Sequence, residues 1–192
     1  MTIMRSLVYF VAVSADGFIA ESDGTFDRFP VEGPHIDALV AEHPETLPGF
    51  VRDALGLSGA GRFDTVLEGR ATHQVGLGAG VGDAYPHLRH LVFSSTLDRA
   101  AVADGIELVR GDALARVREL KAEPGGDLWL CGGGRLASEL LPEIDELLLK
   151  VNPVLFGTGI PLFARPMDAR LHLTDTRPFP NGVIWNTYRL HH

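Results

Sequence analysis

The sequence has one cysteine and a shortage of positive charge, and each shortage excludes a class of protein. Cys131 has no partner within the chain, so an internal disulfide is impossible, which fits a reducing compartment such as the cytoplasm. There are 17 lysine and arginine residues against 25 aspartate and glutamate residues, and no basic run occurs. Because non-specific nucleic-acid binding relies on clustered positive charge, we expect no nucleic-acid partner.

Long hydrophobic runs and targeting segments are also missing. The N-terminal stretch MTIMRSLVYFVAVSADGFIA is apolar, but Ser14 and Asp16 interrupt it, and it has no small-residue cleavage site. It is too short to span a membrane, so we expect a cytoplasmic protein with no membrane partner. With 192 residues, 45% of them hydrophobic, the chain suits one domain over 1–192 with a sizeable core. We assign no function to the closing His191 and His192.

Two familiar site patterns are absent as well. The chain has no G-x-G-x-x-G sequence, which is the usual dinucleotide-binding fingerprint. Its eight histidines are scattered, without ligand-like spacing to carboxylates or to the cysteine. We therefore expect no metal site.

The chain does contain an alternation of apolar strands and amphipathic helices. The segment SLVYFVAV at 6–13 is β-branched and aromatic, which is typical of a buried strand. In the helix expected over 112–121, apolar residues share one face with charges opposite. Further strands are predicted over 63–67, 90–93, 106–109, 127–131, 144–151, 171–176 and 183–190, and further helices over 35–43, 48–57, 135–141 and from Gly69 onward.

Two details of this pattern concern its ends and its glycines. The final strand, 183–190, alternates in polarity and could form an edge of the sheet. The segment GLGAGVG at 76–82 is interpreted as a mobile loop. The repeated β-α-β units predict a mostly parallel sheet with helices on both faces.

Three consecutive glycines at 132–134 separate an expected strand from an expected helix in LWLCGGGRLASELL. Glycine costs roughly 1 kcal/mol of backbone entropy per position, so bare backbone should be needed there. One interpretation is a phosphate cradle, because helix N-termini offer unpaired N–H groups and a positive dipole end. A tight turn without a ligand is the other, and the glycines alone do not decide between them.

Two other strand ends favour a ligand. Arg70 follows Gly69 at the end of FDTVL, and Ser94 and Ser95 follow HLVF. In open α/β sheets ligands bind at the carboxyl ends of strands, so one guanidinium, two hydroxyls and bare backbone would meet there. Each feature also has a plainer interpretation, since Arg70 could pair with a surface carboxylate and the serines could cap a turn.

Six blocks of the sequence occur in the order of one known group of proteins. The chain resembles the dihydrofolate reductase-like superfamily, and more narrowly the stand-alone proteins related to the reductase (C-terminal) domain of the bifunctional deaminase–reductase of riboflavin biosynthesis. The resemblance covers nearly the whole chain. Its blocks are AVSADGFIAESDG (12–24), DTVLEGRATH (64–73), VFSSTLD (92–98), WLCGGGRLASELL (129–141), DELLLKVNPVLFGTGIPLF (145–163) and NGVIWNTYRL (181–190).

The resemblance implies an α/β protein with a three-layer α-β-α architecture, a mostly parallel central sheet and an antiparallel C-terminal strand. It implies NADPH as the cofactor, since a cation with hydroxyls suits a 2′-phosphate, whereas an NAD site prefers a carboxylate. The family positions that hold the adenine-ribose phosphate correspond here to Gly69, Arg70, Thr72, Ser94 and Ser95.

The resemblance also assigns the remaining cofactor contacts. Backbone groups of Ala12 and Ile19 would lie at the nicotinamide carboxamide. Dihydrofolate reductases carry a cis Gly–Gly bond in the glycine turn, for which Gly132–Gly133 is the candidate here. The residues of the turn that would hold the pyrophosphate are Gly132, Gly133, Gly134, Arg135 and Leu136.

Several positions depart from dihydrofolate reductase. The buried carboxylate that binds the pterin has no convincing counterpart, because prolines break the first long helical segment, and Asp37 and Glu42 are interpreted as solvated charges. Ala137 and His73 stand where aromatic residues are usual, and a lone histidine is seldom catalytic.

Two more residues of the family blocks have an open role. Asp16 matches a position near the substrate of relatives and is the one weak catalytic candidate, although an Asp-Gly turn explains it equally well. Cys131 lies on a predicted buried strand and is interpreted as a packing residue.

The expected function is an NADPH-dependent reductase acting on a small heterocyclic or sugar-derived substrate. It would be similar to the 5-amino-6-(5-phosphoribosylamino)uracil reductase domain of riboflavin biosynthesis. The alternatives are dihydrofolate reductase and a non-catalytic NADP-binding dimeric protein. Relatives are often dimers, so we expect a homodimer in which the apolar C-terminal strand takes part.

Overall fold

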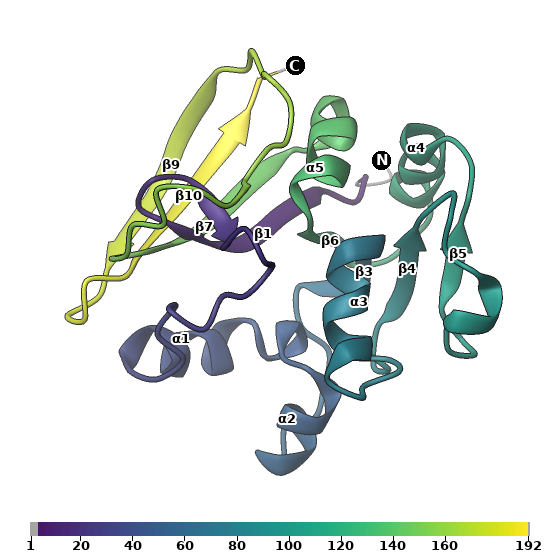
Figure 1. Ribbon diagram of the computed structural model, residues 1–192, viewed down its shortest axis with the longest axis horizontal. Helices are drawn as coiled ribbons and strands as arrows, with labels where there is room; N and C mark the ends of the chain where they lie inside the picture. The colour runs from purple at the N-terminus through teal and green to yellow at the C-terminus, as the bar shows by residue number, and fades with distance from the viewer. Residues whose placement is uncertain (1–3, 192) are drawn as a thin grey trace.

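One eight-stranded sheet organises the protein in the computed structural model, which describes residues 4–191 (Figure 1). The strand order is β5-β4-β3-β6-β1-β7-β10-β9, and β2 and β8 form a separate two-stranded sheet. The strands are β1 (Leu7–Ser14), β2 (Phe18–Ala20), β3 (Phe63–Gly69), β4 (Arg89–Phe93), β5 (Glu107–Val109), β6 (Asp127–Gly132), β7 (Glu146–Asn152), β8 (Ile160–Pro161), β9 (Leu171–Pro178) and β10 (Ile184–Leu190).

The sheet is parallel from β5 to β7 and antiparallel beyond. Strand β1 lies between β6 and β7, with Tyr9 opposite both Leu130 and Leu147. Strand β10 runs antiparallel to β7 and to β9. The predicted parallel sheet with an antiparallel C-terminal strand is therefore confirmed.

Helices cover both faces of this sheet, as Figure 1 shows. Pro34 begins α1, where its fixed φ and missing N–H are tolerated, and the Asp112 carboxylate caps α4 by accepting from the Ala115 N–H at 3.0 Å. The helices are α1 (Pro34–Glu42), α2 (Gly49–Ala54), α3 (Arg70–Gly78), α4 (Ala113–Ala122) and α5 (Gly134–Leu140), with short 3₁₀ turns η1 (Pro44–Thr46), η2 (Arg99–Ala101) and η3 (Leu141–Glu143).

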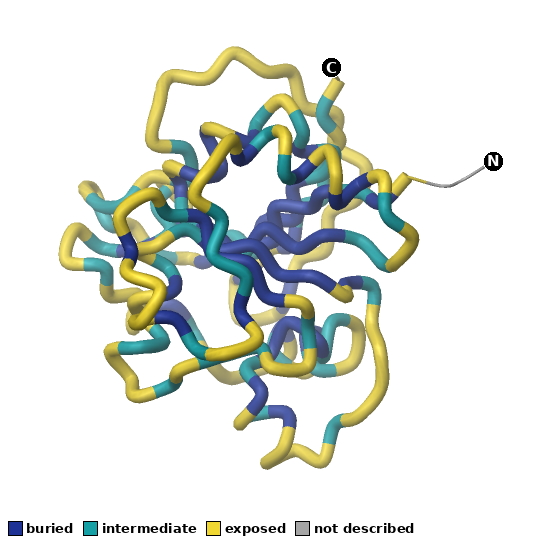
Figure 2. The backbone as a smooth tube through the Cα atoms, turned by 90° about the vertical axis from the view of Figure 1, so that its right-hand side faces the viewer, coloured by how far each residue is buried: buried dark blue, intermediate teal, exposed yellow. Residues whose placement is uncertain are grey.

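Alternation along the strands creates two cores. Leu7 and Tyr9 face α4 and α5, whereas Val8 and Phe10 face the layer that contains α1. Figure 2 shows the strands as the buried centre of the molecule. Both faces of the central strands are therefore apolar, which explains their nearly continuous hydrophobic sequence.

The structure corrects two sequence predictions. The strand at 183–190 is not an edge, because β9 pairs along its outer side. The glycine-rich segment 76–82 is not wholly a loop, because α3 continues through Gly78. Helix α3 tolerates these glycines, although each costs about 1 kcal/mol relative to alanine.

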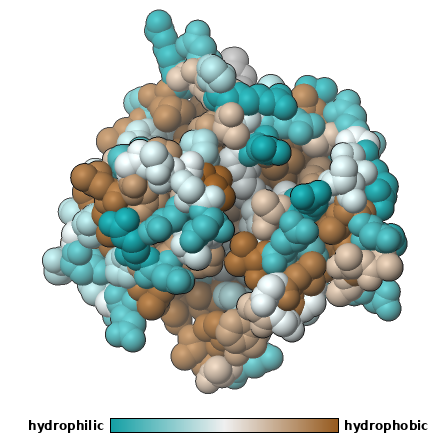
Figure 3. Space-filling model, viewed as in Figure 1, coloured by the Kyte–Doolittle hydropathy of each residue, from teal (hydrophilic) through white to brown (hydrophobic). Residues whose placement is uncertain are grey.

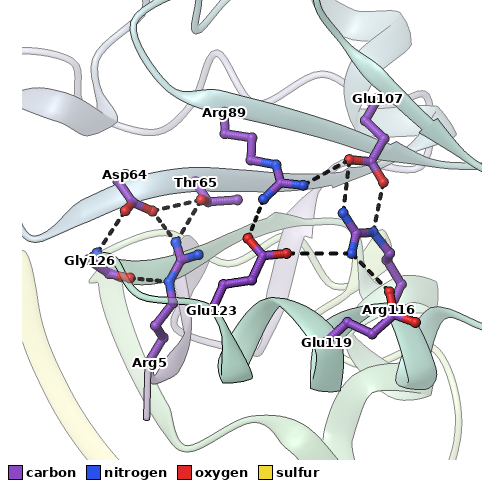
Figure 4. A network of polar contacts seen from close by, with 9 residues as sticks. All are labelled: Arg5, Asp64, Thr65, Arg89, Glu107, Arg116, Glu119, Glu123 and Gly126. Carbon is purple, nitrogen blue, oxygen red and sulfur yellow. Dashed lines mark hydrogen bonds and ion pairs between the residues drawn. The ribbon is translucent and has the colours of Figure 1, made fainter. Parts of the chain in front are cut away.

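A network of ion pairs joins the amino ends of strands to α4, at the edge opposite the glycine turn (Figure 4). Arg5 is buried and donates to the Asp64 carboxylate, to the Thr65 hydroxyl at 2.7 Å and to the Gly126 carbonyl. Arg116 of α4 pairs with Glu107 of β5 at 2.7 Å. The network fixes this end of the sheet by electrostatics and hydrogen bonds.

The exposed apolar residues are dispersed. Figure 3 shows the molecule from the same side as Figure 1, with hydrophilic and hydrophobic residues mixed on the visible face. A hydrophobic area lies at the bottom, where Figure 1 places α2. Helix α2 carries the exposed Phe50. Within residues 4–191, no helix has the length and apolarity needed to cross a bilayer.

We expect the buried Arg5 to matter far more for stability than an exposed ion-pairing arginine. Arg5→Ala leaves the buried Thr65 hydroxyl and the Gly126 carbonyl without their donor, so it should cost about 2–3 kcal/mol in free energy of unfolding. Arg118 pairs with Glu143 while 62% of its side chain is exposed, so Arg118→Ala should cost less than about 1 kcal/mol. Urea unfolding measures both, and equal losses would contradict the account.

Candidate functional site

Three strand ends that carry predicted ligand groups lie side by side in the sheet. Strands β4, β3 and β6 are adjacent and parallel, so the segments that follow them emerge at one edge. Arg70 begins α3 after β3, Ser94 follows β4, and the glycine turn follows β6. Bare backbone, a guanidinium and hydroxyls therefore meet at the carboxyl edge of the sheet.

The three glycines of the turn have three different reasons to be glycine. The Gly132–Gly133 peptide bond is cis, as the resemblance predicted, and Gly132 has φ +142°, which side-chain-bearing residues rarely adopt. A Cβ on Gly134 would lie 2.2 Å from the Pro161 carbonyl oxygen, so close packing requires glycine there. Packing thus requires glycine at position 134 whether or not a ligand approaches its backbone.

Gly133 is the glycine that packing does not explain. Its φ is −98°, and a Cβ there would meet only the Thr72 hydroxyl oxygen at 3.4 Å and Ile19 Cδ1 at 3.8 Å. Gly69 lies against the same turn, because its Cβ would be 3.6 Å from the Gly133 nitrogen. The predicted contacts Ile19, Gly69 and Thr72 thus surround Gly133.

The structure separates the two residues that follow the glycines. Arg135 is exposed at the start of α5, whereas Leu136 is buried in the core that faces α4 and α5. The Leu136 side chain is therefore a packing group, and only its backbone N–H is available to a ligand. First-turn N–H groups of a helix have no intrahelical partner.

Arg70 is oriented toward the segment that follows β4. Its Nη1 donates to the Thr96 hydroxyl at 2.8 Å, and Arg70 makes no ion pair within residues 4–191. The interpretation of Arg70 as half of a surface ion pair therefore finds no partner in the described chain. An exposed guanidinium without a carboxylate keeps its charge available to an anion.

Ser94 caps a turn, as its plainer interpretation held. Its Oγ accepts from the backbone N–H groups of Thr96 at 3.2 Å and Leu97 at 2.9 Å. Its hydroxyl proton is still free to be donated. Ser95 is exposed beside it.

Arg110, which the sequence did not single out, supports this segment. Its guanidinium donates to the Ser95 carbonyl at 3.3 Å and to the Leu97 carbonyl at 2.6 Å. Arg110 follows β5, the edge neighbour of β4, so a fourth strand end contributes a cation near Ser94 and Ser95. An arginine immediately after a predicted strand was the available indication.

Asp16 is held by donors on both sides. Its carboxylate accepts from the Ser14 hydroxyl at 2.6 Å and from the Gly157 N–H at 2.7 Å, with longer bonds from the Phe156 N–H. The Ser14 hydrogen bond is the main reason why the pKa of Asp16 is lowered. These contacts indicate that Asp16 is an ionised residue that connects two loops, rather than a proton donor.

The structure contains a buried carboxylate near the first helices, but at the wrong edge for a substrate. Glu45 in η1 is 1% exposed and accepts from the Phe63 N–H at 3.2 Å. Phe63 begins β3, so Glu45 lies at the amino ends of the strands. Asp37 and Glu42 are exposed, and Glu42 pairs with Arg177. The departure from dihydrofolate reductase at this position therefore persists in the structure.

Lys150 is a second residue that sequence reasoning missed. It is directly opposite Ala12 in the β1–β7 pairing, and its Nζ lies 4.6 Å from the centre of the Phe10 ring. It has no ion pair within residues 4–191, and burial lowers its pKa to about 8. A lone charge within the apolar run LLLKV was its indication in the sequence.

A cluster of buried polar groups lies behind α3. Glu68 of β3 accepts from His90 of β4 at 3.1 Å, and its Oε2 is 3.5 Å from Nδ1 of His73 on α3. The other ring nitrogen of His90 is 2.8 Å from Asp83. Burial favours neutral groups, yet these contacts lower the pKa of Glu68 and raise the pKa of His90.

The cluster corrects the view that the histidines are scattered. Val66, two residues before Glu68, is paired with His90, so both polar side chains share one face of the sheet. Helix α3 folds back over this face and brings His73 to them. Sequence spacing alone does not reveal this convergence, because three separate elements supply the side chains.

Cys131 packs in the core beside this cluster, as predicted. Its thiol interacts with Tyr85, and burial raises the pKa values of both groups. A thiol whose pKa is raised is a poor nucleophile. Cys131 is thus a packing residue rather than a reactive one.

The chain is similar to known proteins over nearly its whole length. The family model of the RibD C-terminal domain matches residues 5–185. The chain is also 29% identical over 182 residues to YwjB, an uncharacterized protein of Bacillus subtilis (strain 168), which covers 93% of this chain and 95% of that protein.

Solved structures share the fold at low sequence identity. One neighbour is a protein of Shewanella sp. PV-4 that is assigned to riboflavin biosynthesis without an established role. Its TM-score is 0.73 at 22% identity, and the match covers 98% of this chain and 100% of that chain. The deaminase/5-amino-6-(5-phosphoribosylamino)uracil reductase of Thermotoga maritima gives 0.65 at 14% identity, with 98% of this chain and 57% of that chain covered. Dihydrofolate reductase of Enterococcus faecalis, complexed with NADP(H), gives 0.59 at 17% identity and 100% coverage of both chains.

The comparisons confirm the predicted family and fold together. The family match extends over nearly the whole length of the chain, and the neighbours are riboflavin-biosynthesis-reductase-like and dihydrofolate reductase-like proteins. The protein belongs to the RibD C-terminal domain family and has a dihydrofolate reductase-like fold.

Proposed function

We propose that the protein is an NADPH-dependent reductase that transfers hydride to a small heterocyclic or sugar-derived substrate. The observation that carries this proposal is the open backbone at Gly133, which neither its φ nor its packing requires to be glycine. It lies at the carboxyl edge of the sheet, next to the first turns of α3 and α5. A pyrophosphate that approaches this backbone would account for it.

Charge and hydroxyls beside the turn suit the remaining phosphate. Arg70 has a free charge, Ser94 and Ser95 offer hydroxyls, and Arg110 holds the segment that carries them. A guanidinium can give a phosphate two parallel hydrogen bonds. This arrangement supports the 2′-phosphate of NADPH over the free 2′-hydroxyl of NADH.

Lys150 marks the substrate side of the proposed site. Ala12, the expected nicotinamide contact, is its direct neighbour on the adjacent strand, and adjacent strands of a sheet lie about 5 Å apart. NADPH would supply the hydride when bound. The ammonium of Lys150 would bind a carbonyl or imine of the substrate and polarise it. The carbon of that group would accept the hydride, and its oxygen or nitrogen would take a proton from the ammonium.

Two alternatives remain distinct from this proposal. Dihydrofolate reductase activity would need a buried carboxylate at the substrate, and the described acidic residues of α1 are exposed. A non-catalytic NADP-binding dimer would keep the phosphate contacts without turnover. The C-terminal strand β10, which was expected to take part in a dimer, lies between β7 and β9. In such a dimer, or in a dimeric enzyme, the edge strand β9, whose residues are all exposed and include Leu171 and Leu173, would therefore contribute the interface.

Titration of the purified protein with NADPH, followed by turnover assays at 340 nm, tests the proposal. Two substrates are tested. One is 5-amino-6-(5-phosphoribosylamino)uracil, prepared without the use of a deaminase, and the other is dihydrofolate. Binding with turnover of the aminopyrimidine supports the proposed reductase, and turnover of dihydrofolate alone supports the first alternative. Binding without turnover on either supports the second, and absence of NADPH binding overturns the cofactor assignment.

Arg70→Ala should weaken NADPH affinity by about ten- to a hundredfold, because a hydrogen bond to a charged group is worth about 1.5–3 kcal/mol. NADH lacks the 2′-phosphate, so its affinity should change little. Arg70→Lys should recover only part of the loss, since an ammonium lacks the fork of the guanidinium. Isothermal titration with both cofactors measures this, and an equal loss for the two would contradict the assignment.

Gly133→Val should abolish NADPH binding while the protein stays folded. The branched side chain fits the φ of −98° but would occupy the approach to the backbone. Gly111→Val is the matched control, because a Cβ on Gly111 meets nothing within 4 Å and lies outside the turn. Circular dichroism checks folding, and normal NADPH binding by folded Gly133→Val would refute the role of this glycine.

Lys150→Met should raise the melting temperature at pH 7 and lower turnover. Burial lowers the pKa of Lys150 from 10.5 to about 8, so the folded state holds the ammonium less favourably than the unfolded state does. The penalty is complete below pH 8 and fades as the pH rises to 10.5. The stability gain of the variant should fade over the same range, which thermal unfolding at several pH values measures. A loss of stability at pH 7 would show that the ammonium has a stabilising partner.

A further inference from the structure

The polar cluster behind α3 brings three metal-ligating atoms together. Glu68 Oε2, His73 Nδ1 and His90 Nε2 all lie within 4.8 Å of one another. Their side chains are 5%, 3% and 1% exposed, so water does not satisfy them. Buried polar groups without sufficient partners are costly, and this cluster needs a physical explanation.

The spacing of these atoms fits ligands of one ion. A tetrahedral ion with bonds of about 2.0–2.2 Å has ligand atoms roughly 3.4 Å apart. Glu68 Oε2 lies 3.1 Å from His90 Nε2 and 3.5 Å from His73 Nδ1. The second distance exceeds the ordinary range for a hydrogen bond, about 2.7–3.2 Å.

The hydrogen bond between Asp83 and His90 points to the same conclusion. Asp83 Oδ1 is 2.8 Å from Nδ1 of His90, so this nitrogen carries a proton. In a neutral imidazole the lone pair of Nε2 then faces the Glu68 carboxylate. Either a second proton or a cation must lie between them. A carboxylate behind a ligating histidine is the usual support of a metal site.

One proton does not satisfy the whole cluster. A proton on Nε2 of His90 fills the space toward Glu68, but it leaves His73 at 3.5 Å from the same oxygen. A cation would bind all three groups at once. The direction of two imidazoles toward one carboxylate oxygen favours such a cation.

We propose that Glu68, His73 and His90 form a Zn²⁺-binding site that fixes the first turn of α3 to the sheet. Two imidazoles and a carboxylate suit Zn²⁺, and the elements that carry them are a helix and two strands. The site goes beyond the proposed reductase function and does not depend on it. Because Arg70 and Thr72 lie in the same turn as His73, the ion would also hold the phosphate contacts in place.

Zn²⁺ alone is the probe, added to the full-length protein after chelator treatment. The background carries His172→Gln, His191→Gln and His192→Gln, because the rings of His172 and His191 are 6.1 Å apart and could capture Zn²⁺ at the surface. We expect one Zn²⁺ per chain with micromolar or tighter affinity. At a free concentration of 100 times Kd, the melting temperature should rise by about 5–10 °C.

Variants assign the site to these residues. Glu68→Gln and His73→Phe should each weaken Zn²⁺ binding at least a hundredfold, whereas His87→Gln, a histidine outside the cluster, should leave it unchanged. Loading the wild-type cluster with Co²⁺ should produce the visible absorption of a tetrahedral ion, which keeps the test valid if a variant fails to fold. Absence of Zn²⁺ binding in the background protein, or binding that survives both substitutions, would overturn the proposal and leave protons to hold the cluster.

Discussion

The parallel pairing of six strands is the constraint on which the rest of the structure depends. Parallel strands must all end at the same edge, so residues far apart in the sequence emerge together there. The glycine turn, Arg70 and Ser94 become neighbours because β6, β3 and β4 are neighbours. The opposite edge carries the ion pairs of Figure 4, which fix the sheet without limiting access to the ligand edge. The ion-pair network and the proposed cofactor site thus lie at different ends of the same strands.

Each glycine of the turn is glycine for a different physical reason, and this difference defines the candidate site. Backbone conformation requires Gly132, and the Pro161 carbonyl requires Gly134. Between them, Gly133 remains bare without a structural need of its own. A turn built only for chain reversal would have no reason to leave that position open. Gly133 is therefore the one glycine of the turn that supports a ligand, and the number of glycines alone would not single it out.

Local pattern predicted the strands of the eight-stranded sheet and most helices, because apolar alternation and caps are properties of neighbouring residues. The short strands β2 and β8 were not predicted. Partnership across the sheet was not predictable in the same way. Strand 183–190 has the polarity of an edge strand, yet β9 covers it. Glu68, His73 and His90 have unremarkable spacing, and only the pairing of β3 with β4 and the return of α3 bring them together. Arg110 and Lys150 were visible as isolated charges, but their meaning came from their neighbours across the sheet.

The two faces of the sheet differ in a way that stability alone does not explain. The face toward α4 and α5 is aliphatic, and its buried Tyr9 hydroxyl is satisfied by the Leu162 carbonyl at 3.1 Å. The face toward α1 and α3 holds the Glu68 cluster and Lys150, all of which lose hydration on folding. An apolar core of similar volume would be more stable than such groups. Their position is therefore informative, because both lie toward the carboxyl ends of their strands, on the side of the sheet where the proposed function would bring a substrate to Ala12.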